Sequence, residues 1–375
     1  MKKVIVIGLG IVGAVTSYQL ARRNVNVIMI DSKEKGRSTY AAAGMVNPWT
    51  TKRRNKAWYK LATLGAKWYD ELIQQLSDDG LTSFGYEKVG TLHLHNDETK
   101  LNELVTAITE RQKTEKAIGK IEVLDEEETF KLFPYIKKEY KGVFISGVGR
   151  VDGQLFTESL INGAKKHGAE QIIGKAQLIV ENDRVTGVIV ENKKIDADAV
   201  ILTNGIWMPQ SLQQIGIEMP LTIRKGEIIH LQTHENTNKL PVVIPPSNKY
   251  ILPFNDGKIL VGTTFTRTEF SEKQVEPSIN GIYEILHATL QVAPELANSL
   301  ITQIRTGFRP YTANSLPLFG QIPSIENLYA GNGLGASGLS TGPMIGLQLA
   351  KLINDEPLDV NALDYSFAKI IDITK

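Results

Sequence analysis

Apolar residues near the start of the chain predict a strand–helix–strand unit. Residues 3–8 (KVIVIG) form a continuous apolar run, which is typical of a parallel strand that is buried on both faces. Ile11, Val15 and Tyr18 then recur at helical spacing, and a second buried strand fits residues 25–31 (VNVIMID). Two parallel strands joined by a crossover helix are the opening of an α/β domain.

Further helices are predicted where apolar residues recur every three or four positions. Between Trp58 and Leu76 this spacing persists over a long amphipathic segment, and its aromatic residues are interpreted as a core-facing stripe. The same reasoning predicts four more helices, near residues 97–117, 149–170, 278–292 and 343–353.

The middle of the chain has the pattern of strands. Short alternating segments precede a buried strand at 198–205 (DAVILTNG), and residues 221–265 are rich in strand-forming residues. Asp256-Gly257 within that region is typical of a hairpin turn. We therefore expect an α/β protein, α+β overall, in which a sheet-rich domain interrupts the first domain.

The composition excludes several classes of function. The chain has 375 residues, of which 42% are hydrophobic and 22% charged, as in ordinary soluble proteins with two or three structural units. A formal net charge of +1 gives no indication of a nucleic-acid partner. The sequence contains no cysteine, which excludes disulfides, thiolate metal sites, a cysteine nucleophile and a cofactor tethered through cysteine.

The termini and the histidines add two expectations. The apolar start carries glycines at regular spacing and ends in Ala21-Arg22-Arg23, unlike a signal peptide, and no segment reaches the ~20 apolar residues of a membrane span. We expect a cytoplasmic protein without a transmembrane segment. His93 and His95 alternate on one strand without a third ligand, so they are interpreted as surface residues and no metal site is predicted.

A glycine fingerprint follows the first strand. Gly8, Gly10 and Gly13 have the GxGxxG spacing, and Asp31 ends the second strand. Glycines at these positions allow a tight turn and close approach of a pyrophosphate to the helix N-terminus, while the acid accepts hydrogen bonds from a ribose. The fingerprint predicts a dinucleotide site, but it does not separate NAD from FAD.

A series of later motifs identifies a family. In chain order they are AAAGMV (41–46), GRVD (149–152), TNGIW (203–207), KGEIIHL (225–231), YILPFNDGKILVGTT (250–264), GFRP (307–310) and GLGASGLSTGP (333–343). With the fingerprint, this order resembles the FAD-dependent amine oxidoreductases that include D-amino-acid oxidase, glycine oxidase, sarcosine oxidase and D-amino-acid dehydrogenases. The resemblance runs through the whole chain.

The resemblance implies FAD, bound non-covalently. Asp31 would hold the adenosine ribose. A second glycine-rich loop, residues 333–343, would wrap the flavin, with Pro343 in the first turn of the last helix. The implied cofactor-binding residues are Gly8, Gly10, Ile11, Val12, Gly13, Asp31, Ser32, Ala43, Gly44, Met45, Ala176, Gln177, Thr203, Asn204, Gly205, Trp207, Gly335, Ala336, Ser337, Gly338, Leu339 and Ser340.

Two residues are candidates for the substrate side. Arg309, in GFRP, matches the arginine that clamps the substrate carboxylate in amino-acid oxidases of this family, and a planar guanidinium suits a carboxylate. The alternative is that Arg309 bonds to backbone carbonyls or to a structural acid. Tyr250 matches a substrate-side tyrosine of glycine oxidases; the alternative is a half-buried strand tyrosine.

The implied reaction is oxidation of the carbon–nitrogen bond of glycine, a D-amino acid, sarcosine or a similar amine. Hydride transfer to flavin N5 would give an imine that water converts to a keto acid, with molecular oxygen or another electron acceptor completing the cycle. The late loop here lacks the histidine often found in the family and the second arginine of glycine oxidase. Two other readings stay open: a nicotinamide-dependent dehydrogenase and a flavoprotein with purely structural FAD.

The resemblance also implies an interleaved domain arrangement. A GxGxxG-type FAD-binding domain is expected from residues 1–85, 146–220 and 305–375. An antiparallel-sheet substrate-binding domain is expected from residues 86–145 and 221–304. The active site would lie where the two meet, and a homo-oligomer is compatible with the sequence.

Overall fold

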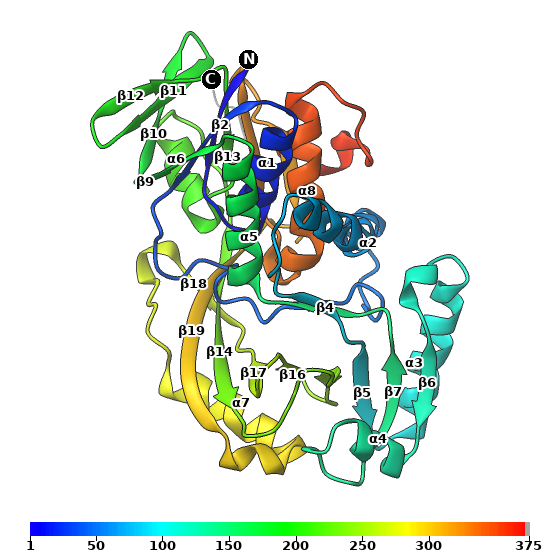
Figure 1. Ribbon diagram of the computed structural model, residues 1–375. Helices are drawn as coiled ribbons and strands as arrows, with labels where there is room; N and C mark the ends of the chain where they lie inside the picture. Colours follow the sequence, from blue (N-terminus) through cyan, green and yellow to red (C-terminus); the bar gives the residue numbers. More distant parts are fainter. Residues whose placement is uncertain (372–375) are drawn as a thin grey trace.

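A six-stranded sheet forms the centre of the lobe that holds the amino terminus (Figure 1). The computed structural model describes residues 1–371. All the strands are parallel except β20, which pairs antiparallel with β21 at one edge. In spatial order the strands are β20 (Leu318–Gln321), β21 (Leu328–Asn332), β13 (Ala199–Leu202), β1 (Lys3–Ile7), β2 (Asn26–Asp31) and β9 (Glu170–Ile173).

The two faces of this sheet are covered differently. On β1, Val4 and Val6 pack into the core shared with the helices, whereas Ile5 and Ile7 pack into a second core. That second core lies beneath a three-stranded antiparallel sheet of β10 (Ala176–Glu181), β11 (Arg184–Val190) and β12 (Lys193–Asp196). Because both faces are buried, the strand is apolar at every position after Lys3, as the sequence predicts.

Helices cover the other face. They are α1 (Ile11–Arg22), α2 (Lys56–Asp78), α5 (Gly153–Lys166) and α8 (Gly338–Ile353), and a short α6 (Met208–Gln213) follows β13. Within this layer α1 packs against α5 and α8, and α8 also packs against α2. The predicted long amphipathic helix and the helix near 149–170 are confirmed as α2 and α5.

The last helix corrects one prediction. It begins at Gly338 rather than at residue 343, so Pro343 lies inside the helix and not in its first turn. A proline there has no N–H for the carbonyl of Leu339, one turn back. The hydroxyl of Tyr69, from α2, donates to that carbonyl at 2.7 Å instead. Burial raises the pKa of Tyr69 well above its usual range, so the hydroxyl keeps the proton that it donates.

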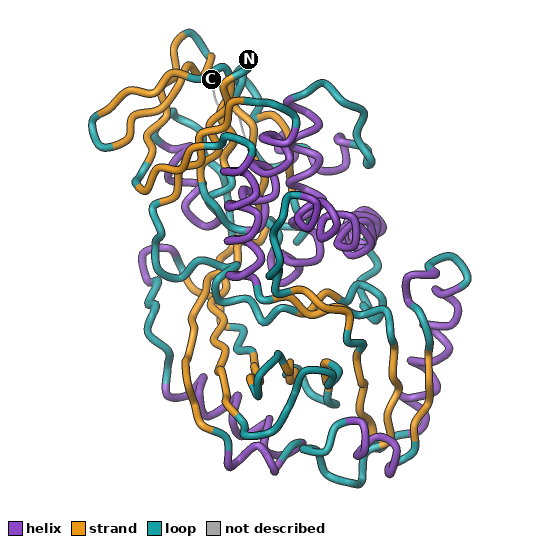
Figure 2. The backbone as a smooth tube through the Cα atoms, in the orientation of Figure 1, coloured by secondary structure: helices purple, strands orange, loops and turns teal. Residues whose placement is uncertain are grey.

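The second lobe is built on a nine-stranded sheet, drawn in orange in the lower half of Figure 2. It is antiparallel except for the parallel pair β5 and β15, which lies at the junction of two parts of the chain. The strands run β18 (Thr266–Thr268), β14 (Thr222–Gln232), β17 (Lys258–Gly262), β16 (Tyr250–Pro253), β15 (Val242–Ile244), β5 (Thr91–His95), β7 (Lys141–Ile145) and β6 (Ile121–Leu124), with β19 (Leu300–Tyr311) pairing with β14.

The predicted hairpin and helices of this lobe are confirmed. Asp256 and Gly257 both have positive φ in the turn between β16 and β17. The predicted helices near 97–117 and 278–292 correspond to α3 (Glu98–Gln112) and α7 (Ile279–Val292). A short helix, α4 (Glu126–Leu132), begins at a capping box formed by Asp125 and Glu128.

A small fourth sheet connects the two lobes. It consists of β3 (Met45–Val46), β8 (Gly149–Val151) and β4 (Tyr86–Lys88), which come from three separate parts of the chain. The exact domain limits given above remain a proposal. One of them, at residue 305, falls inside β19, and the final residues of the first domain, 372–375, lie outside the described part of the chain.

Candidate functional site

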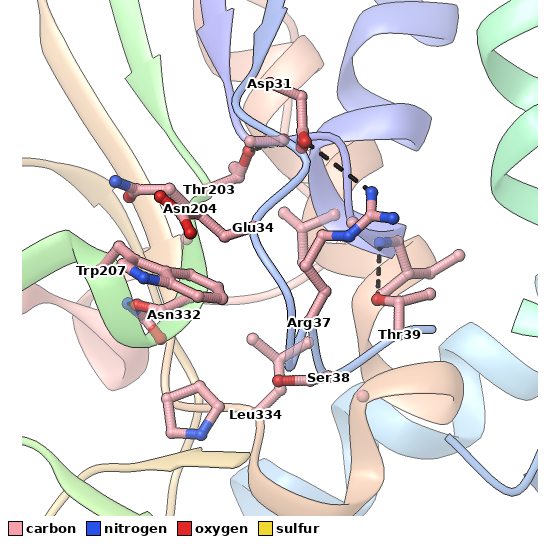
Figure 3. Close-up of a pocket in the computed structure, with 18 of the residues that line it drawn as sticks. Asp31, Glu34, Arg37, Ser38, Thr39, Thr203, Asn204, Trp207, Asn332 and Leu334 are labelled. Carbon is pink, nitrogen blue, oxygen red and sulfur yellow. Dashed lines mark hydrogen bonds and ion pairs between the residues drawn. The ribbon is translucent and has the colours of Figure 1, made fainter. Parts of the chain in front are cut away.

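An elongated cavity of about 460 Å³ lies where the two lobes meet. One part of its wall comes from the carboxyl ends of β1, β2 and β13, the edge at which open α/β sheets bind ligands. The other part comes from Tyr250 on β16, Arg309 on β19 and the start of α8. Figure 3 shows part of this wall, including Asp31, Arg37 and Trp207.

Asp31 stands at the end of β2 with both carboxylate oxygens engaged. Oδ2 accepts a hydrogen bond from the Leu9 amide at 2.6 Å, and Oδ1 accepts one from the Lys33 amide at 2.6 Å. The Arg37 guanidinium lies 3.7 Å from Oδ1. Figure 3 marks this ion pair with a dashed line. A carboxylate oxygen accepts more than one hydrogen bond, so Asp31 retains acceptor capacity for a ribose.

The fingerprint glycines act in two ways. A Cβ on Gly8 would lie 2.6 Å from the Cα of Asn204, and one on Gly13 would lie 1.9 Å from the carbonyl oxygen of Gly8. Gly8 is therefore required by the close approach of the chain that follows β13, and Gly13 by the close packing of α1 on the end of β1; Gly13 does not line the cavity. Gly10 lines it and is the N-cap of α1, where it has no side chain to occupy the helix amides; the Thr39 hydroxyl accepts from one of them, that of Ile11.

Other glycines keep the cavity wall smooth. A Cβ on Gly205 would meet no protein atom within 4 Å, and one on Gly338 would meet only the Leu334 Cβ, at 4.0 Å. Both residues line the cavity, so a side chain at either position would project into it. A glycine is needed at Gly205 for a further reason, because its φ is +57°.

Two buried polar atoms in the wall have no partner in the described protein. They are the Oδ1 atom of Asn204 and the Nε1 atom of Trp207, and both residues line the cavity. Buried polar groups are normally hydrogen-bonded, so these atoms point to a polar ligand. Together with Asp31, the N-terminus of α1 and the wall glycines that leave open space, they fit FAD.

Most of the predicted cofactor residues meet at this cavity. Those that line it are Gly8, Gly10, Ile11, Val12, Asp31, Ser32, Ala43, Gly44, Met45, Ala176, Gln177, Thr203, Asn204, Gly205, Trp207, Gly335, Ala336, Gly338 and Leu339. Ser337 and Ser340 do not. The Ser337 hydroxyl accepts from Trp58 Nε1 at 3.0 Å, and the Ser340 carbonyl packs against Gly65 of α2.

Sequence reasoning predicted cofactor residues at both ends of the segment between β2 and β3 but missed three in its middle. Arg37, Ser38 and Thr39 line the cavity (Figure 3), and the Thr39 hydroxyl accepts from the Ile11 amide at 3.1 Å. The segment is a loop, so it carries no periodic signal. The serine and threonine before AAAGMV were the available sign, because hydroxyl side chains bond readily to backbone groups.

Arg309 lies in the cavity wall with only neutral hydrogen-bond partners. Its Nη2 donates to the Thr263 hydroxyl at 2.9 Å, and its Nη1 donates to the Thr264 carbonyl at 3.3 Å. Among the described residues no carboxylate forms an ion pair with it. Part of the alternative raised from the sequence, bonding to a backbone carbonyl, is therefore present, but its charge has no protein counter-ion.

Tyr250 lines the same end of the cavity. Burial raises the pKa of its hydroxyl, although the positive charge of Arg309 opposes the rise. The phenol is therefore protonated at neutral pH and is a hydrogen-bond donor. Nearby Tyr311 also has a raised pKa, mainly through burial, with Arg309, Arg224 and Arg53 each acting against the rise.

The structure also bears on the location of His93, on metal binding and on membrane-spanning helices. His93 is buried, not on the surface as interpreted, and burial lowers its pKa to about 4. Within residues 1–371 no group of three or more His, Asp or Glu side chains is arranged to hold a metal ion. No helix in that range has the length and apolar character needed to cross a bilayer.

Comparison with known proteins gives consistent matches over nearly the whole chain. A family model described as FAD dependent oxidoreductase matches residues 3–352. An uncharacterized oxidoreductase, YurR of Bacillus subtilis, is 42% identical over 97% of this chain and 98% of its own. Glycine oxidase of Pseudomonas aeruginosa is 26% identical over 95% of this chain and 96% of its own.

Solved structures agree. The crystal structure of iminodiacetate oxidase from Chelativorans sp. BNC1 is similar with a TM-score of 0.92 and 36% identity, covering 97% of this chain and 98% of that one. Glycine oxidase from Bacillus cereus gives a TM-score of 0.83 at 22% identity over 97% and 98% of the two chains, a likeness of fold.

Proposed function

The chain belongs to the family of FAD-dependent oxidoreductases, and we propose that it oxidises the carbon–nitrogen bond of a small amine that carries a carboxylate. This class of substrate includes amino acids and secondary amines such as sarcosine. Family membership makes the chain a flavoenzyme, which removes the nicotinamide-dependent dehydrogenase from consideration. What remains to be proposed is the substrate and the part that each residue plays.

One observation carries the proposal: a guanidinium without a counter-ion faces the cavity. Arg309 is fixed by Thr263 and Thr264 through neutral groups, so its charge remains available to a ligand. Its partly buried place in the cavity wall strengthens an ion pair relative to water, and its planar shape suits a carboxylate. A substrate with a carboxylate beside its amine would be held by this residue.

The chain's own residues would hold FAD along the rest of the cavity. Asp31 would bind the ribose, Gly10 and the start of α1 the pyrophosphate, and Gly338 the flavin side, where α8 begins. Positive charge at a helix N-terminus favours an electron-rich ring edge. When bound, FAD supplies the acceptor for the hydride that leaves the substrate carbon.

The remaining residues orient the substrate and exclude water. Arg309 would set the position of the carboxylate, and the protonated Tyr250 would donate a hydrogen bond to the substrate at the same end. The carboxylates that line the cavity are those of Asp31, the last residue of β2, and Glu34, just after it, and both lie on the proposed ribose side. The substrate amine would therefore lose its proton to solvent before oxidation, with no side-chain base.

Anaerobic mixing of the purified holoprotein with an amine panel tests the proposal. The panel is glycine, sarcosine, proline, D-alanine and iminodiacetate, the last because a structurally similar protein is an iminodiacetate oxidase. We expect at least one carboxylate-bearing amine to bleach the visible flavin absorbance, with an imine or keto acid as product. Bleaching by no member of the panel would contradict this substrate class.

Admitting air to the reduced protein would then identify the acceptor. Rapid return of the absorbance with formation of hydrogen peroxide is expected of an oxidase. A slow return, accelerated by an artificial electron acceptor, would indicate a dehydrogenase.

A further inference from the structure

Three arginines lie in one row across three neighbouring strands. Arg224 on β14 pairs directly with Arg309 on β19 and, on its other side, with Arg267 on β18. Residues directly opposite each other in a sheet project from the same face, and adjacent strands lie about 4.8 Å apart. Three like charges are therefore aligned along a line that starts in the cavity wall at Arg309.

The three charges are not balanced in the same way. Arg267 is exposed, and its Nε lies 3.9 Å from Glu269. Arg224 and Arg309 form no ion pair with any acid among residues 1–371, and the Nε atom of Arg224 is buried without a hydrogen-bond partner. Like charges that face each other across strands are destabilising, so the inner pair is suited to an added anion.

Two aromatic rings hold the Arg224 side chain. Its guanidinium carbon lies 4.4 Å from the centre of the Phe265 ring and 5.2 Å from that of Tyr311. The two rings meet edge to face at 5.9 Å. Stacking on ring faces orients a guanidinium and leaves its N–H edge free, the geometry needed for a carboxylate.

Arg224 lies close to the cavity through Tyr311. A Cβ on Gly335 would be 2.3 Å from the Tyr311 ring, and Gly335 itself lines the cavity. Tyr311 also forms a backbone bridge with Leu334, a further wall residue. The path from Arg309 to Arg224 therefore borders the substrate end of the cavity and leads toward Phe265, which is 46% exposed.

We propose that Arg224 binds a second carboxylate of the substrate, so that the preferred substrate is a secondary amine with a carboxylate on each arm. This inference rests on the proposed function, because it assigns Arg309 to the first carboxylate. A molecule whose two carboxylates are separated by a methylene, an amine nitrogen and a second methylene would use both guanidiniums. Arg224 then selects dicarboxylates over monocarboxylates.

Sarcosine and iminodiacetate form the matched pair for the test, since they differ only by the second carboxylate. The measurement is the ratio of kcat/KM for iminodiacetate to that for sarcosine. Replacing a charge-assisted hydrogen bond with an apolar group, as in Arg224→Met, is expected to lower this ratio about 10- to 100-fold, mainly through KM for iminodiacetate. Arg267→Met, in the same row but exposed and paired with Glu269, is the control and should keep the wild-type ratio.

A binding measurement on the wild-type holoprotein avoids any dependence on folding of the variant. Diglycolate and methoxyacetate carry two and one carboxylates around an ether oxygen and cannot be oxidised as amines. Perturbation of the flavin spectrum should give a Kd at least about tenfold lower for diglycolate, as a second charged contact requires. Equal dissociation constants would overturn the assignment.

The proposed function and the binding of a second carboxylate by Arg224 are contradicted by different results. If sarcosine and iminodiacetate both reduce the flavin but Arg224→Met leaves their ratio unchanged, the second-carboxylate inference is wrong and the proposed function stands. If neither amine nor any other member of the panel reduces the flavin, the proposed function is wrong, and the inference with it.

Discussion

At the scale of single residues, the buried carboxylate of Glu227 supports the substrate side of the cavity without lining it. Glu227 accepts hydrogen bonds from the Ser278 amide at 2.7 Å and the Thr264 hydroxyl at 2.9 Å, and Lys225 lies 3.2 Å away. Thr264 in turn accepts from Arg309. Glu227 therefore positions the segment that orients the proposed clamp.

The charge state of Glu227 gives a pH prediction. Burial acts to raise its pKa, but the hydrogen bonds from Ser278 and Thr264 and the charge of Lys225 outweigh it, so the pKa lies below its usual value. A depressed folded-state pKa contributes stability that is complete above the unfolded pKa of about 4.3 and is lost as pH falls through the folded value.

The measurement is the free energy of unfolding in urea for wild type and Glu227→Gln between about pH 3 and 7. We expect the wild type to be more stable near neutrality by about 1–3 kcal/mol, the cost of weakening buried charge-assisted hydrogen bonds. This advantage should shrink as the pH falls below 4. A difference that stays constant with pH would show that the carboxylate charge is not involved.

Single residues could be predicted from the sequence where the local backbone geometry admits few residue types. Gly8, Gly13 and Asp31 were found from the sequence because the tight turn, the close helix–strand packing and the acid at the end of the second strand each admit few residue types. Arg224 was missed, since its proximity to Arg309 arises from pairing of strands more than 80 residues apart in the chain. No local spacing in the sequence records such a pair.

At the scale of elements, α8 unites the cofactor wall with the helical layer. Its first residues line the cavity, whereas its later part packs against α1 and α2. The sequence placed its start at Pro343 because proline is favoured in a first turn. That reasoning failed because Tyr69 of another helix supplies the hydrogen bond that proline cannot.

The Tyr69–Leu339 bond predicts a coupled pair of substitutions. Tyr69→Phe leaves the buried Leu339 carbonyl without a donor and should lower the free energy of unfolding by about 1–3 kcal/mol. In a Pro343→Ala background the new backbone N–H reaches the same carbonyl, so Tyr69→Phe should cost less. Urea unfolding of the four proteins measures this coupling. If Tyr69→Phe lowers the free energy of unfolding equally in both backgrounds, the Tyr69 hydroxyl does not replace the backbone N–H that Pro343 lacks.

The start of α8 also predicts a separation of stability from cofactor binding. Gly338 has helical backbone angles, φ −53° and ψ −43°, and open space where a Cβ would stand. Gly338→Ala and Gly338→Leu should therefore stabilise the apoprotein by up to about 1 kcal/mol through helix propensity.

The same series should weaken FAD binding as the side chain grows into the cavity. Flavin released on dilution, followed by its fluorescence, measures the affinity, and thermal unfolding of the apoproteins is the control. Loss of FAD together with loss of apoprotein stability would mean that the side chain disturbs the fold. Full retention of FAD by Gly338→Leu would place the flavin elsewhere.

At the scale of the whole molecule, the chain passes back and forth between two lobes and so brings distant segments to one cavity. Family resemblance predicted this interleaving, because motifs from both lobes occur in a fixed order. The parallel pairing of β5 with β15 within an otherwise antiparallel sheet was not predicted. It joins segments about 150 residues apart, and neither strand carries a signal of its partner's direction.

The central claim is that Arg309 holds the carboxylate of an amine at this cavity. Anaerobic stopped-flow mixing of FAD-loaded wild type and Arg309→Met with the best amine of the panel tests it directly. Loss of a buried, charge-paired contact of about 2–5 kcal/mol should lower the second-order rate of flavin reduction about 30- to 4,000-fold.

The FAD content of the variant should stay at the wild-type level in that experiment. Arg305→Met is the matched control, since Arg305 lies on the same strand as Arg309 but does not line the cavity, and it donates to the Gln303 side chain and the Tyr40 carbonyl. We expect slow reduction in Arg309→Met alone. Reduction of Arg309→Met at the wild-type rate would contradict the central claim.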